Sequence, residues 1–348
     1  MRIVIATTQV PFVWGGAEIL AEGLVQALRA EGHLAEIVAI PFKWYPPERI
    51  LDHMLASRLL DVTESTGIPV DRVIGLKFPA YFVPHPNKVL WILHQHRTAY
   101  DLWDHALSDL IRFPDGLQVR NAIRAADAQL LPEAKHIFTI SGNVSRRLKE
   151  YCSIHSTPLY HPPQHAEHFY CAPADDYVFF PSRLAPLKRQ AMVLEAMAET
   201  KQSVRVRFAG GAEHPTYAAA LQAQAQRLNI SHRVEWLGPV TEEEKRRQYA
   251  CALGVVYPPL DEDYGYVALE AMLASKPLLT CSDAGGPLEF VRPGETGLIA
   301  EPTPKALAAV MDALWDDRQR ARAMGEAGRA FYERQQINWH TVVQRLLM

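Results

Sequence analysis

Short runs of apolar residues alternate along the chain with segments in which apolar residues recur every three or four positions. Residues 2–8, RIVIATT, form the first run. Residues 17–32 follow with apolar side chains at a helical spacing, among them Leu20, Leu24 and Leu28. The first pattern is typical of a buried β-strand and the second of an amphipathic helix.

The same alternation continues through the first half of the chain. Continuous apolar strands separated by helices indicate a parallel sheet that is covered on both faces. We prefer a strand at the N-terminus to a signal peptide, because Pro11 and Gly15-Gly16 follow it at once. Further strands are predicted at residues 34–40, 71–76, 88–93 and 136–141.

A proline-rich segment, residues 158–175, interrupts the pattern and is typical of a linker. Behind it the alternation restarts. We therefore predict an α/β protein with two doubly wound Rossmann-like domains, residues 1–165 and 166–331, that face a central cleft where a ligand binds. Strands of the second domain are predicted at residues 177–182, 204–210, 233–238, 252–258 and 277–282.

Length and composition agree with this organisation. The 348 residues suffice for two domains, and 48% hydrophobic with 22% charged residues is typical of a soluble globular protein. A net charge of -3 gives a nucleic-acid partner no general electrostatic support. No run is long enough to span a membrane. The four cysteines lack metal-binding spacing, so we expect reduced thiols and a cytoplasmic protein.

Two short stretches place anion-binding groups after the first strand of each predicted domain. Gly15 and Gly16 let the backbone approach a ligand at a helix N-terminus, although the dinucleotide motif GxGxxG is missing. A plain strand-to-helix turn is the alternative. Arg183 and Lys188 follow the first strand of the second domain and suit a diphosphate. A solvated cationic loop is the alternative there.

The stretch PPLDEDYGYVALEAM, residues 258–272, predicts a loop followed by a helix that starts near Gly265. The backbone amides of Gly265, Tyr266 and Val267 would form an anion-binding helix N-terminus. Glu270 lies in the second turn among apolar neighbours, where a buried carboxylate needs donors such as the two hydroxyls of a ribose. A surface carboxylate near the end of the helix is the alternative.

The acidic triplet Asp261-Glu262-Asp263 in this stretch also matches the D-x-D metal signature of another class of sugar-nucleotide enzymes. Short acidic triplets are frequent by chance, and this one follows a late strand of the second domain. We therefore expect no metal site there.

Together these stretches resemble family 4 of the retaining glycosyltransferases, which have the two-Rossmann-domain GT-B architecture. The resemblance covers nearly the whole chain. Its marker, two glutamates separated by seven residues, is matched by Glu262 and Glu270 within EDYGYVALEAM. The segment 285–302 also fits. The C-terminal helix, about 332–348, is similar to the closing helix of the family, which crosses back to the first domain.

The resemblance implies roles for the matched residues. The N-terminal domain would bind the acceptor and the second domain the nucleotide-sugar donor. Glu262 would contact the donor sugar beside the reacting carbon, and Glu270 would bind the ribose hydroxyls. Val240 would offer backbone groups to the base. The remaining donor-binding residues would be Gly15, Gly16, Arg183, Lys188, Gly265, Tyr266 and Val267.

One departure from the family concerns the catalytic group of the first domain. Many members carry a histidine after the fourth strand of the first domain, and in this chain the corresponding position lies near Lys77, with no histidine there. The next strand ends in LHQHRTAYDLWDH, which supplies His94, His96 and Arg97. Any of these could face the donor sugar or the acceptor, and we take His94 as the candidate catalytic residue in addition to Glu262. The acceptor-side candidates are Lys77, His96, Arg97 and Tyr100. A solvated loop residue is the alternative for each histidine.

We therefore expect a retaining hexosyltransferase that uses a UDP- or GDP-sugar, needs no metal or other cofactor, and acts in glycan or polysaccharide biosynthesis. The acceptor could be a glycan, a lipid-linked molecule or a small molecule. Alternatives are a sugar-nucleotide epimerase of the same fold, a phosphorylase, which lacks a supporting lysine context, and a non-catalytic sugar-nucleotide-binding protein. The stretch 42–50, FKWYPPERI, is interpreted as a surface loop in preference to a peripheral contact with the inner membrane face.

Overall fold

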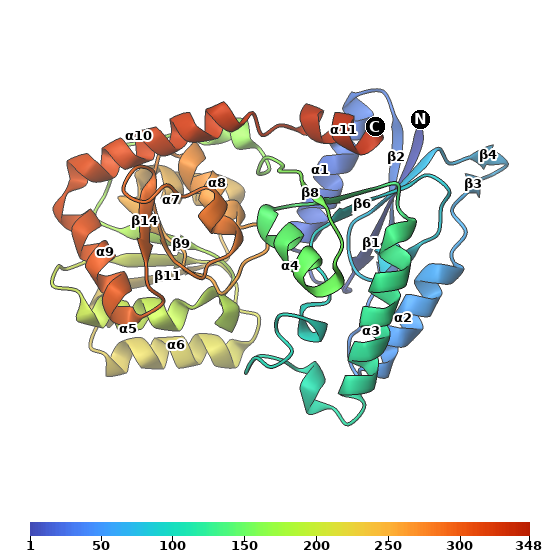
Figure 1. Ribbon diagram of the computed structural model, residues 1–348. Helices are drawn as coiled ribbons and strands as arrows, with labels where there is room; N and C mark the ends of the chain where they lie inside the picture. Colours follow the sequence, from blue (N-terminus) through green and yellow to red (C-terminus); the bar gives the residue numbers. More distant parts are fainter. The chain divides into compact units, whose positions relative to one another are not determined.

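A computed structural model describes all residues from Met1 to Met348 and divides them into two compact units (Figure 1). The first unit contains Met1–Gln164 and Asn338–Met348, and the second contains His165–Ile337. The expected domain boundary at residue 165 lies one residue beyond the end of the first segment. The C-terminal portion that joins the first unit begins at 338 rather than at about 332, because residues 332–335 complete a long helix of the second unit.

The first unit is built around a six-stranded parallel sheet with the order β2-β1-β5-β6-β7-β8. A small antiparallel hairpin, β3 and β4, stands apart from it. The strands are β1 (Arg2–Gln9), β2 (Leu34–Pro41), β3 (Glu64–Ser65), β4 (Ile68–Pro69), β5 (Arg72–Gly75), β6 (Lys88–Ile92), β7 (His136–Thr139) and β8 (Thr157–Pro158).

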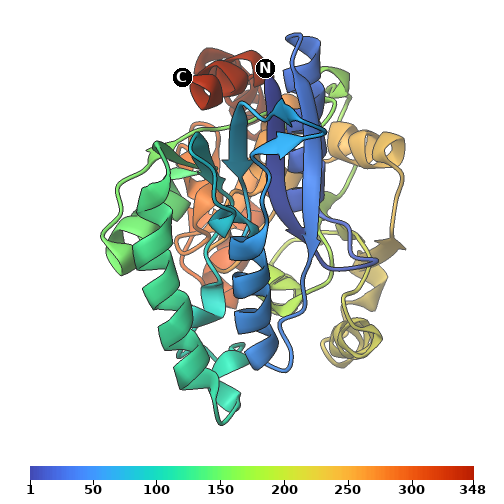
Figure 2. The ribbon, with the colours of Figure 1, turned by 90° about the vertical axis from the view of Figure 1, so that its right-hand side faces the viewer.

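Helices cover both faces of this sheet. The chain moves one strand outward from β1 to β2 and then returns past β1 to β5, and right-handed crossovers in opposite directions place their helices on opposite faces. Accordingly α1 packs with α11, whereas α2 packs with α3 (Figure 2). The helices are α1 (Gly16–Ala30), α2 (Glu48–Leu59), α3 (Gly116–Leu130), α4 (Gly142–Cys152) and α11 (Trp339–Leu347).

The C-terminal helix α11 is anchored to the first unit by specific contacts. The side chain of Asn338 caps it by accepting a hydrogen bond from the backbone amide of Thr341 at 2.8 Å. The ring of Trp339 lies against Gly23 of α1, where a methyl group would come within 2.5 Å of it. At the other end, Arg72 donates a hydrogen bond to the carbonyl of Leu346 at 2.6 Å. A segment distant in sequence thus completes one face of the first sheet.

The second unit repeats the architecture with the strand order β11-β10-β9-β12-β13-β14, all parallel. Its strands are β9 (Val178–Pro181), β10 (Val206–Ala209), β11 (Val234–Gly238), β12 (Gly254–Val256), β13 (Leu278–Cys281) and β14 (Gly297–Ala300). Its helices are α5 (Gln190–Glu199), α6 (Pro215–Arg227), α7 (Glu242–Cys251), α8 (Tyr266–Leu273), α9 (Pro304–Asp316) and α10 (Arg318–Gln335).

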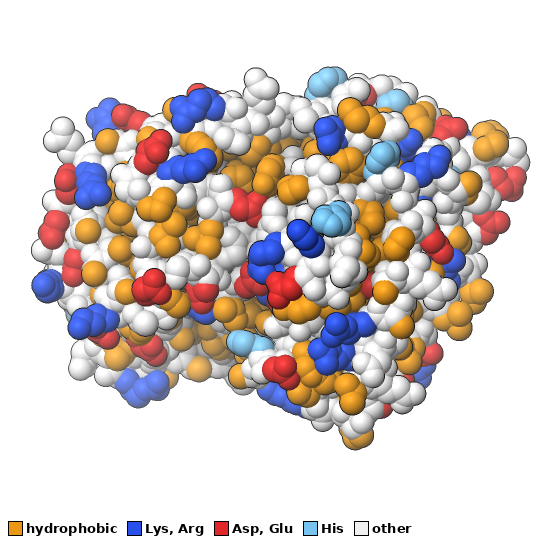
Figure 3. Space-filling model, viewed as in Figure 1, with side chains coloured by type: hydrophobic (Ala, Val, Ile, Leu, Met, Phe, Trp, Pro, Cys, Tyr) orange, Lys and Arg blue, Asp and Glu red, His pale blue; other side chains and the backbone are white.

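The prediction of two doubly wound α/β domains is confirmed. The sequence pattern missed β14, in which two of the four residues are partly exposed, and the two-residue strands β3, β4 and β8. No helix has the length and apolar composition needed to cross a membrane. The four cysteines form no disulfide. On the face shown in Figure 3, acidic and basic side chains are interspersed, in line with the net charge of -3.

Candidate functional site

The strand order of the second unit defines where its ligand site should be. From β9 the chain winds outward to β10 and β11, and it then returns to place β12 on the other side of β9. Such a reversal opens a crevice at the carboxyl ends of the two central strands, which is where doubly wound sheets bind ligands. The segment after β9 carries Lys188, and the segment after β12 carries Tyr257 and Glu262.

Lys188, Glu262 and Tyr257 meet at this crevice. The ammonium group of Lys188 pairs with the carboxylate of Glu262 and donates a hydrogen bond to the hydroxyl of Tyr257 at 3.0 Å. Burial by itself would lower the pKa of Lys188, but the adjacent Glu262 and Tyr257 outweigh it and raise the pKa above its ordinary value. Lys188 is therefore a fixed positive charge at the strand ends.

The loop that carries Glu262 is held by backbone hydrogen bonds to the loop after β13. The amide of Glu262 donates to the carbonyl of Ala284 at 2.9 Å, and the amide of Gly286 donates to the carbonyl of Glu262 at 2.8 Å. Gly265 starts α8 at a φ of +77°, and a side chain there would come within 2.6 Å of Pro287. Only glycine satisfies both this backbone conformation and this close contact.

The N-terminus of α8 begins directly after this loop. Gly265 is the residue that caps the helix, and Tyr266 and Val267 are its first two residues. The first N–H groups of a helix lack partners within the helix and favour a negatively charged ligand. The structure thus brings the three predicted backbone positions to the same strand end as Glu262.

Glu270 is buried in the second turn of α8, as predicted, with 7% of its surface exposed. Its two carboxylate oxygens accept hydrogen bonds from Lys245 at 3.0 Å and from the hydroxyl of Tyr249 at 2.7 Å, both on α7. Protein groups therefore supply the donors that the sequence analysis assigned to a ribose. A carboxylate has about four acceptor positions, so further acceptor capacity remains for a ligand.

Arg183 is more exposed to solvent than Lys188, the other cation of the predicted diphosphate site. Its guanidinium forms an ion pair with Glu213 at 2.7 Å, and 53% of its side chain is exposed. Val240 is half-buried in the loop after β11 and precedes Thr241, which caps α7. The helix that follows Val240 is therefore the helix that supplies Lys245 to Glu270.

In the first unit, the corresponding reversal lies between β1 and β5. The carboxylate of Glu18 accepts a hydrogen bond from the amide of Gly15 at 2.9 Å and lies 3.8 Å from the ammonium group of Lys77. Through Glu18, the glycine turn at Gly15-Gly16, where α1 begins, is linked to Lys77 in the segment after β5. The structure brings Gly15 and Lys77 together through an acid that sequence reasoning had not assigned.

The segment after β6 carries the candidate histidines. The Nδ1 atom of His94 lies 2.7 Å from the carbonyl of Gln95, and the ring is half-buried. The ring of His96 packs against Phe78 at a centroid distance of 5.2 Å, and burial lowers its pKa to about 4. With this lowered pKa, His96 is neutral at pH 7. The next residue, Arg97, forms an ion pair with Asp101 at 2.7 Å.

Tyr100 differs from the expectation that it faces an acceptor. It is buried, and its hydroxyl donates a hydrogen bond to Asp127 of α3 at 2.7 Å. Tyr81 donates to the same carboxylate at 2.9 Å. Burial raises the pKa of Asp127 to about 6 despite these bonds. The side chain of Tyr100 thus attaches the segment 94–100 to the core of the first unit.

Sequence reasoning missed several residues that complete these contacts. Tyr257 directly follows β12 and ends its apolar run. Its position at the carboxyl end of a central strand could have indicated that it belongs to the site. Glu18 lies within the GGAE turn and could have been considered with Lys77. Lys245, Tyr249 and Asp127 gave no signal, because nothing in a helical pattern identifies the side chain to which a distant polar group will bond.

A cavity in the first unit is lined by other residues. Its volume is about 510 Å³, and its lining includes His136, His155 and Arg345. These residues surround the amino ends of β7 and β8, whereas doubly wound sheets bind ligands at the carboxyl ends. We therefore do not assign the donor or the acceptor to it.

Comparison with known proteins identifies the second unit. Residues 172–331 match the family model described as glycosyl transferases group 1. The second unit is a group 1 glycosyltransferase domain. The donor-side residues of the second unit, from Arg183 to Glu270, lie within the matched range, whereas Gly15 and Gly16 of the first unit lie outside it.

The related proteins of known name agree with this domain assignment. The chain is 35% identical over 165 residues to a D-inositol 3-phosphate glycosyltransferase of Nocardia farcinica, covering 44% of this chain and 36% of that protein. It is 31% identical over 134 residues to the alpha-1,3/1,6-mannosyltransferase ALG2 of Dictyostelium discoideum, covering 37% and 32%. These matches span about a third of the length of the relatives.

Solved structures resemble the whole chain. The sucrose-phosphate synthase of Thermosynechococcus elongatus superposes with a TM-score of 0.77 at 19% identity, over 99% of this chain and 97% of that one. The Anabaena protein HepE, crystallised with UDP and glucose, gives a TM-score of 0.71 at 18% identity, over 100% and 98%. This likeness shows the fold, which is GT-B.

Proposed function

We propose that this protein is a retaining glycosyltransferase that moves a hexose from a UDP- or GDP-sugar to an acceptor hydroxyl. The observation that carries the proposal is the contact of Lys188 with Glu262 and Tyr257 at the strand reversal of the group 1 glycosyltransferase domain. A fixed cation, a carboxylate and a helix N-terminus at one strand end suit a phosphorylated sugar.

The donor diphosphate would take over the cations that now pair with carboxylates. Lys188 would leave Glu262 and bind phosphate oxygens instead. The exposed Arg183 would leave Glu213 in the same way. Together with the N-terminus of α8, they would stabilise the negative charge that develops on the departing diphosphate, without a metal ion. Glu262, released from Lys188, would then face the donor sugar.

The nucleoside would lie toward α7 and α8. Glu270 is held in place by Lys245 and Tyr249 and would accept hydrogen bonds from the ribose hydroxyls. Val240, in the loop before α7, would offer backbone groups to the base. Because HepE shares the fold and was crystallised with UDP-glucose, we would test UDP-sugars before GDP-sugars.

The first unit would bind the acceptor. His94 would be its catalytic residue, with His96, Arg97 and Lys77 beside the acceptor and Gly15 and Gly16 near the diphosphate. We assign Tyr100 to support this segment rather than to the acceptor, because its hydroxyl is bonded to Asp127. The product would serve glycan or polysaccharide biosynthesis.

Exposed aromatic residues favour a lipid-linked acceptor among the acceptor classes. Phe12 and Trp14 follow β1, and Trp44 and Tyr45 follow β2; all four are exposed. The two loops leave neighbouring strands, since Gln9 and Pro41 are paired at their ends. Aromatic side chains at such positions suit a membrane–water interface. Peripheral contact with a membrane surface is therefore part of the proposal.

A thermal-shift panel of UDP- and GDP-sugars, with EDTA and then with Mg²⁺, tests the donor site. A ligand at about 100 times its Kd stabilises the fold by about 2.7 kcal/mol. We expect a metal-independent shift with one nucleotide, its loss in Lys188→Ala, and an unchanged shift in Lys305→Ala, which removes an exposed lysine of the same unit. An equal shift in both variants would contradict the assigned diphosphate site.

Product analysis then separates the functions. With glycan, lipid-linked and small-molecule acceptors, we expect transfer that depends on the acceptor and keeps the anomeric configuration. Turnover of the sugar nucleotide without any acceptor would favour an epimerase. Binding without turnover under all conditions would favour a non-catalytic sugar-nucleotide-binding protein.

A further inference from the structure

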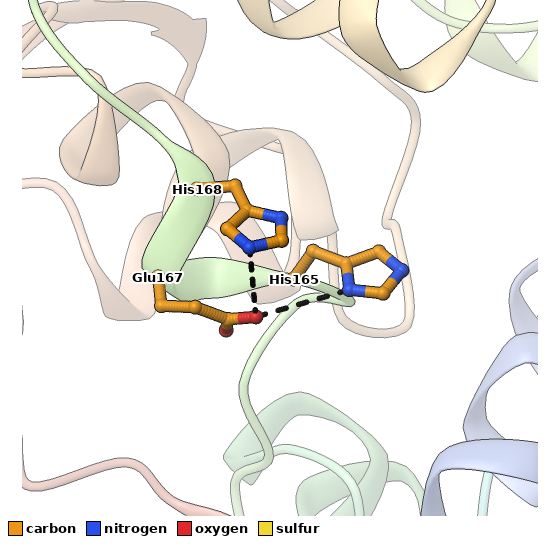
Figure 4. Close-up of side chains that lie close together, drawn as sticks. All are labelled: His165, Glu167 and His168. Atoms are coloured by element: carbon orange, nitrogen blue, oxygen red, sulfur yellow. Dashed lines mark ion pairs between the residues drawn. The ribbon is translucent and has the colours of Figure 1, made fainter.

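A cluster of three metal-ligand side chains, none of them assigned to the proposed donor site, lies at the first residues of the second unit. His165, Glu167 and His168 belong to the turn around the 3-10 helix Ala166–His168. One ligand atom from each lies within 4.8 Å of the other two. Figure 4 shows one nitrogen of each imidazole ring facing the same carboxylate oxygen of Glu167.

The backbone of the turn explains why the two histidines converge. The amide of His168 donates a hydrogen bond to the carbonyl of His165 at 2.9 Å, which closes a three-residue turn. In a 3-10 turn the side chains at positions i and i+3 eclipse each other. The two rings are accordingly stacked, with centroids 5.4 Å apart and planes inclined by 10°.

The turn is fixed to the body of the second unit by the next residue. Phe169 is buried and packs edge-to-face against Tyr249 at a centroid distance of 5.8 Å. His165 itself adopts a left-handed conformation with a φ of +53°. The three ligand side chains therefore project from an ordered turn, while all three remain exposed to solvent and to ions in it.

The distances within the cluster fit coordination of one ion. One oxygen of Glu167 lies 3.8 Å from Nδ1 of His165 and 3.6 Å from Nε2 of His168. Two ligands of a tetrahedral Zn²⁺, each about 2.0–2.1 Å from the metal, are about 3.3 Å apart. Coordination of one ion would require these exposed side chains to rotate, so that the three atoms move closer and the two nearly parallel rings turn their nitrogen lone pairs toward a common point.

We propose that His165, Glu167 and His168 form a binding site for Zn²⁺ or a similar late transition-metal ion. Two imidazole nitrogens and one carboxylate oxygen are a zinc ligand set, and water would complete the tetrahedron. Imidazole ligands select Zn²⁺, Cu²⁺ or Ni²⁺ over Mg²⁺ and Ca²⁺, which prefer oxygen. The expected absence of a metal concerned the transfer reaction, and this ion would take no part in it.

Titration with Zn²⁺ tests the site. Full-length protein is freed of metal with EDTA, desalted, and titrated in the presence of a chromophoric zinc chelator. We expect one Zn²⁺ to bind per chain, and we expect a loss of affinity of at least tenfold in the double variant His165→Gln/His168→Gln. Excess Mg²⁺ should not displace the ion.

A matched control is provided by another exposed histidine. His340 lies 3.0 Å from Glu31, so this pair supplies two ligand atoms without a third. His340→Gln should bind Zn²⁺ as the wild type does. The melting temperature of each metal-free variant shows whether the substitutions leave the fold intact, which we expect because all these histidines are exposed.

The exposed thiol of Cys171 is the competing ligand nearby in sequence. Co²⁺ substitution distinguishes the two, because thiolate coordination produces an intense near-ultraviolet band that histidine and carboxylate ligands do not. Zn²⁺ affinity that is equal in wild type and double variant, or a thiolate band that Cys171→Ser abolishes together with binding, would overturn the proposal. The donor panel does not depend on this result, since Lys188 and Glu262 are not part of the turn.

Discussion

Single residues of the second unit show how the side chains of the proposed donor site are held in place by one another. A lysine at a strand end would be costly to bury alone, and here Glu262 and Tyr257 compensate its charge. The buried Glu270 is likewise satisfied by Lys245 and Tyr249. Each side chain is thus held near the position that the proposed chemistry requires, and binding of the proposed donor would replace one set of polar partners by another.

Asp127 is a buried residue of the first unit whose ionisation should affect stability. Burial raises its pKa to about 6 from an ordinary 3.8, so the folded state holds its proton more tightly than the unfolded state does. This contribution to stability is present at low pH and is lost as the pH rises from about 4 through 6. The shift corresponds to about 3 kcal/mol.

Asp127→Asn removes this titration while keeping the shape of the side chain. Chemical denaturation of variant and wild type between pH 4 and 7 should therefore show the variant gaining stability relative to the wild type, by up to about 3 kcal/mol. Asp104→Asn, at an exposed position of the same unit, should show no such trend. Parallel pH curves for Asp127→Asn and wild type would disprove the assignment.

At the scale of elements, close approaches between helices and loops decide which segments belong together. The loops after β12 and β13 approach so closely that Gly265 and Gly286 have no room for a side chain. Helix α11 packs on the first unit because the ring of Trp339 contacts α1 at Gly23, where a larger residue would overlap with the ring. Both approaches depend on small residues that a hydrophobic pattern does not reveal.

Gly23→Ala tests the docking of α11. The added methyl group would lie 2.5 Å from the ring of Trp339, and such overpacking typically costs about 1–3 kcal/mol. Gly328→Ala in α10 is the control, because its methyl group would meet ordinary contacts at 3.5 Å or more. There, the better helix propensity of alanine should leave stability unchanged or raise it by up to about 1 kcal/mol. Equal effects in urea denaturation would contradict the docking.

At the scale of the whole molecule, the chain consists of two units with separate cores. Each has its own six-stranded sheet, and no strand is shared between the sheets. The proposed donor contacts from Lys188 to Glu270 belong to the second unit, whereas the candidate acceptor residues belong to the first. Binding of a nucleotide should therefore stabilise chiefly one of the two units.

Calorimetry should accordingly resolve two unfolding transitions. A saturating UDP- or GDP-sugar, whichever the panel identifies, should raise the transition of the second unit by more than that of the first. Gly23→Ala should lower only the transition of the first unit. A single transition that responds equally to the nucleotide and to Gly23→Ala would show that the two units unfold as one.

The sequence by itself determined the fold class and the positions of most strands. Continuous apolar runs and helical spacing depend on local burial, and the stretch 262–272 carries enough specific residues to indicate the glycosyltransferase likeness that the family model shows for residues 172–331. Strands β8 and β14 were not predicted from the sequence, because β8 has only two residues and two of the four residues of β14 are partly exposed, so their hydrophobic signal is weak. The start of the C-terminal segment that joins the first unit was predicted at about 332, whereas the last helix of the second unit continues to Gln335. The helical spacing does not show where one helix ends and the next begins.

Only the tertiary structure decided which polar groups are partners. It paired Lys188 with Glu262, Arg183 with Glu213, and Glu270 with Lys245. It turned Tyr100 into the core and brought His165 and His168 together across one turn. A pattern of apolar residues specifies which face of an element is buried, but a polar contact depends on the positions of two distant elements to within about an ångström. Such precision arises only when the whole domain packs.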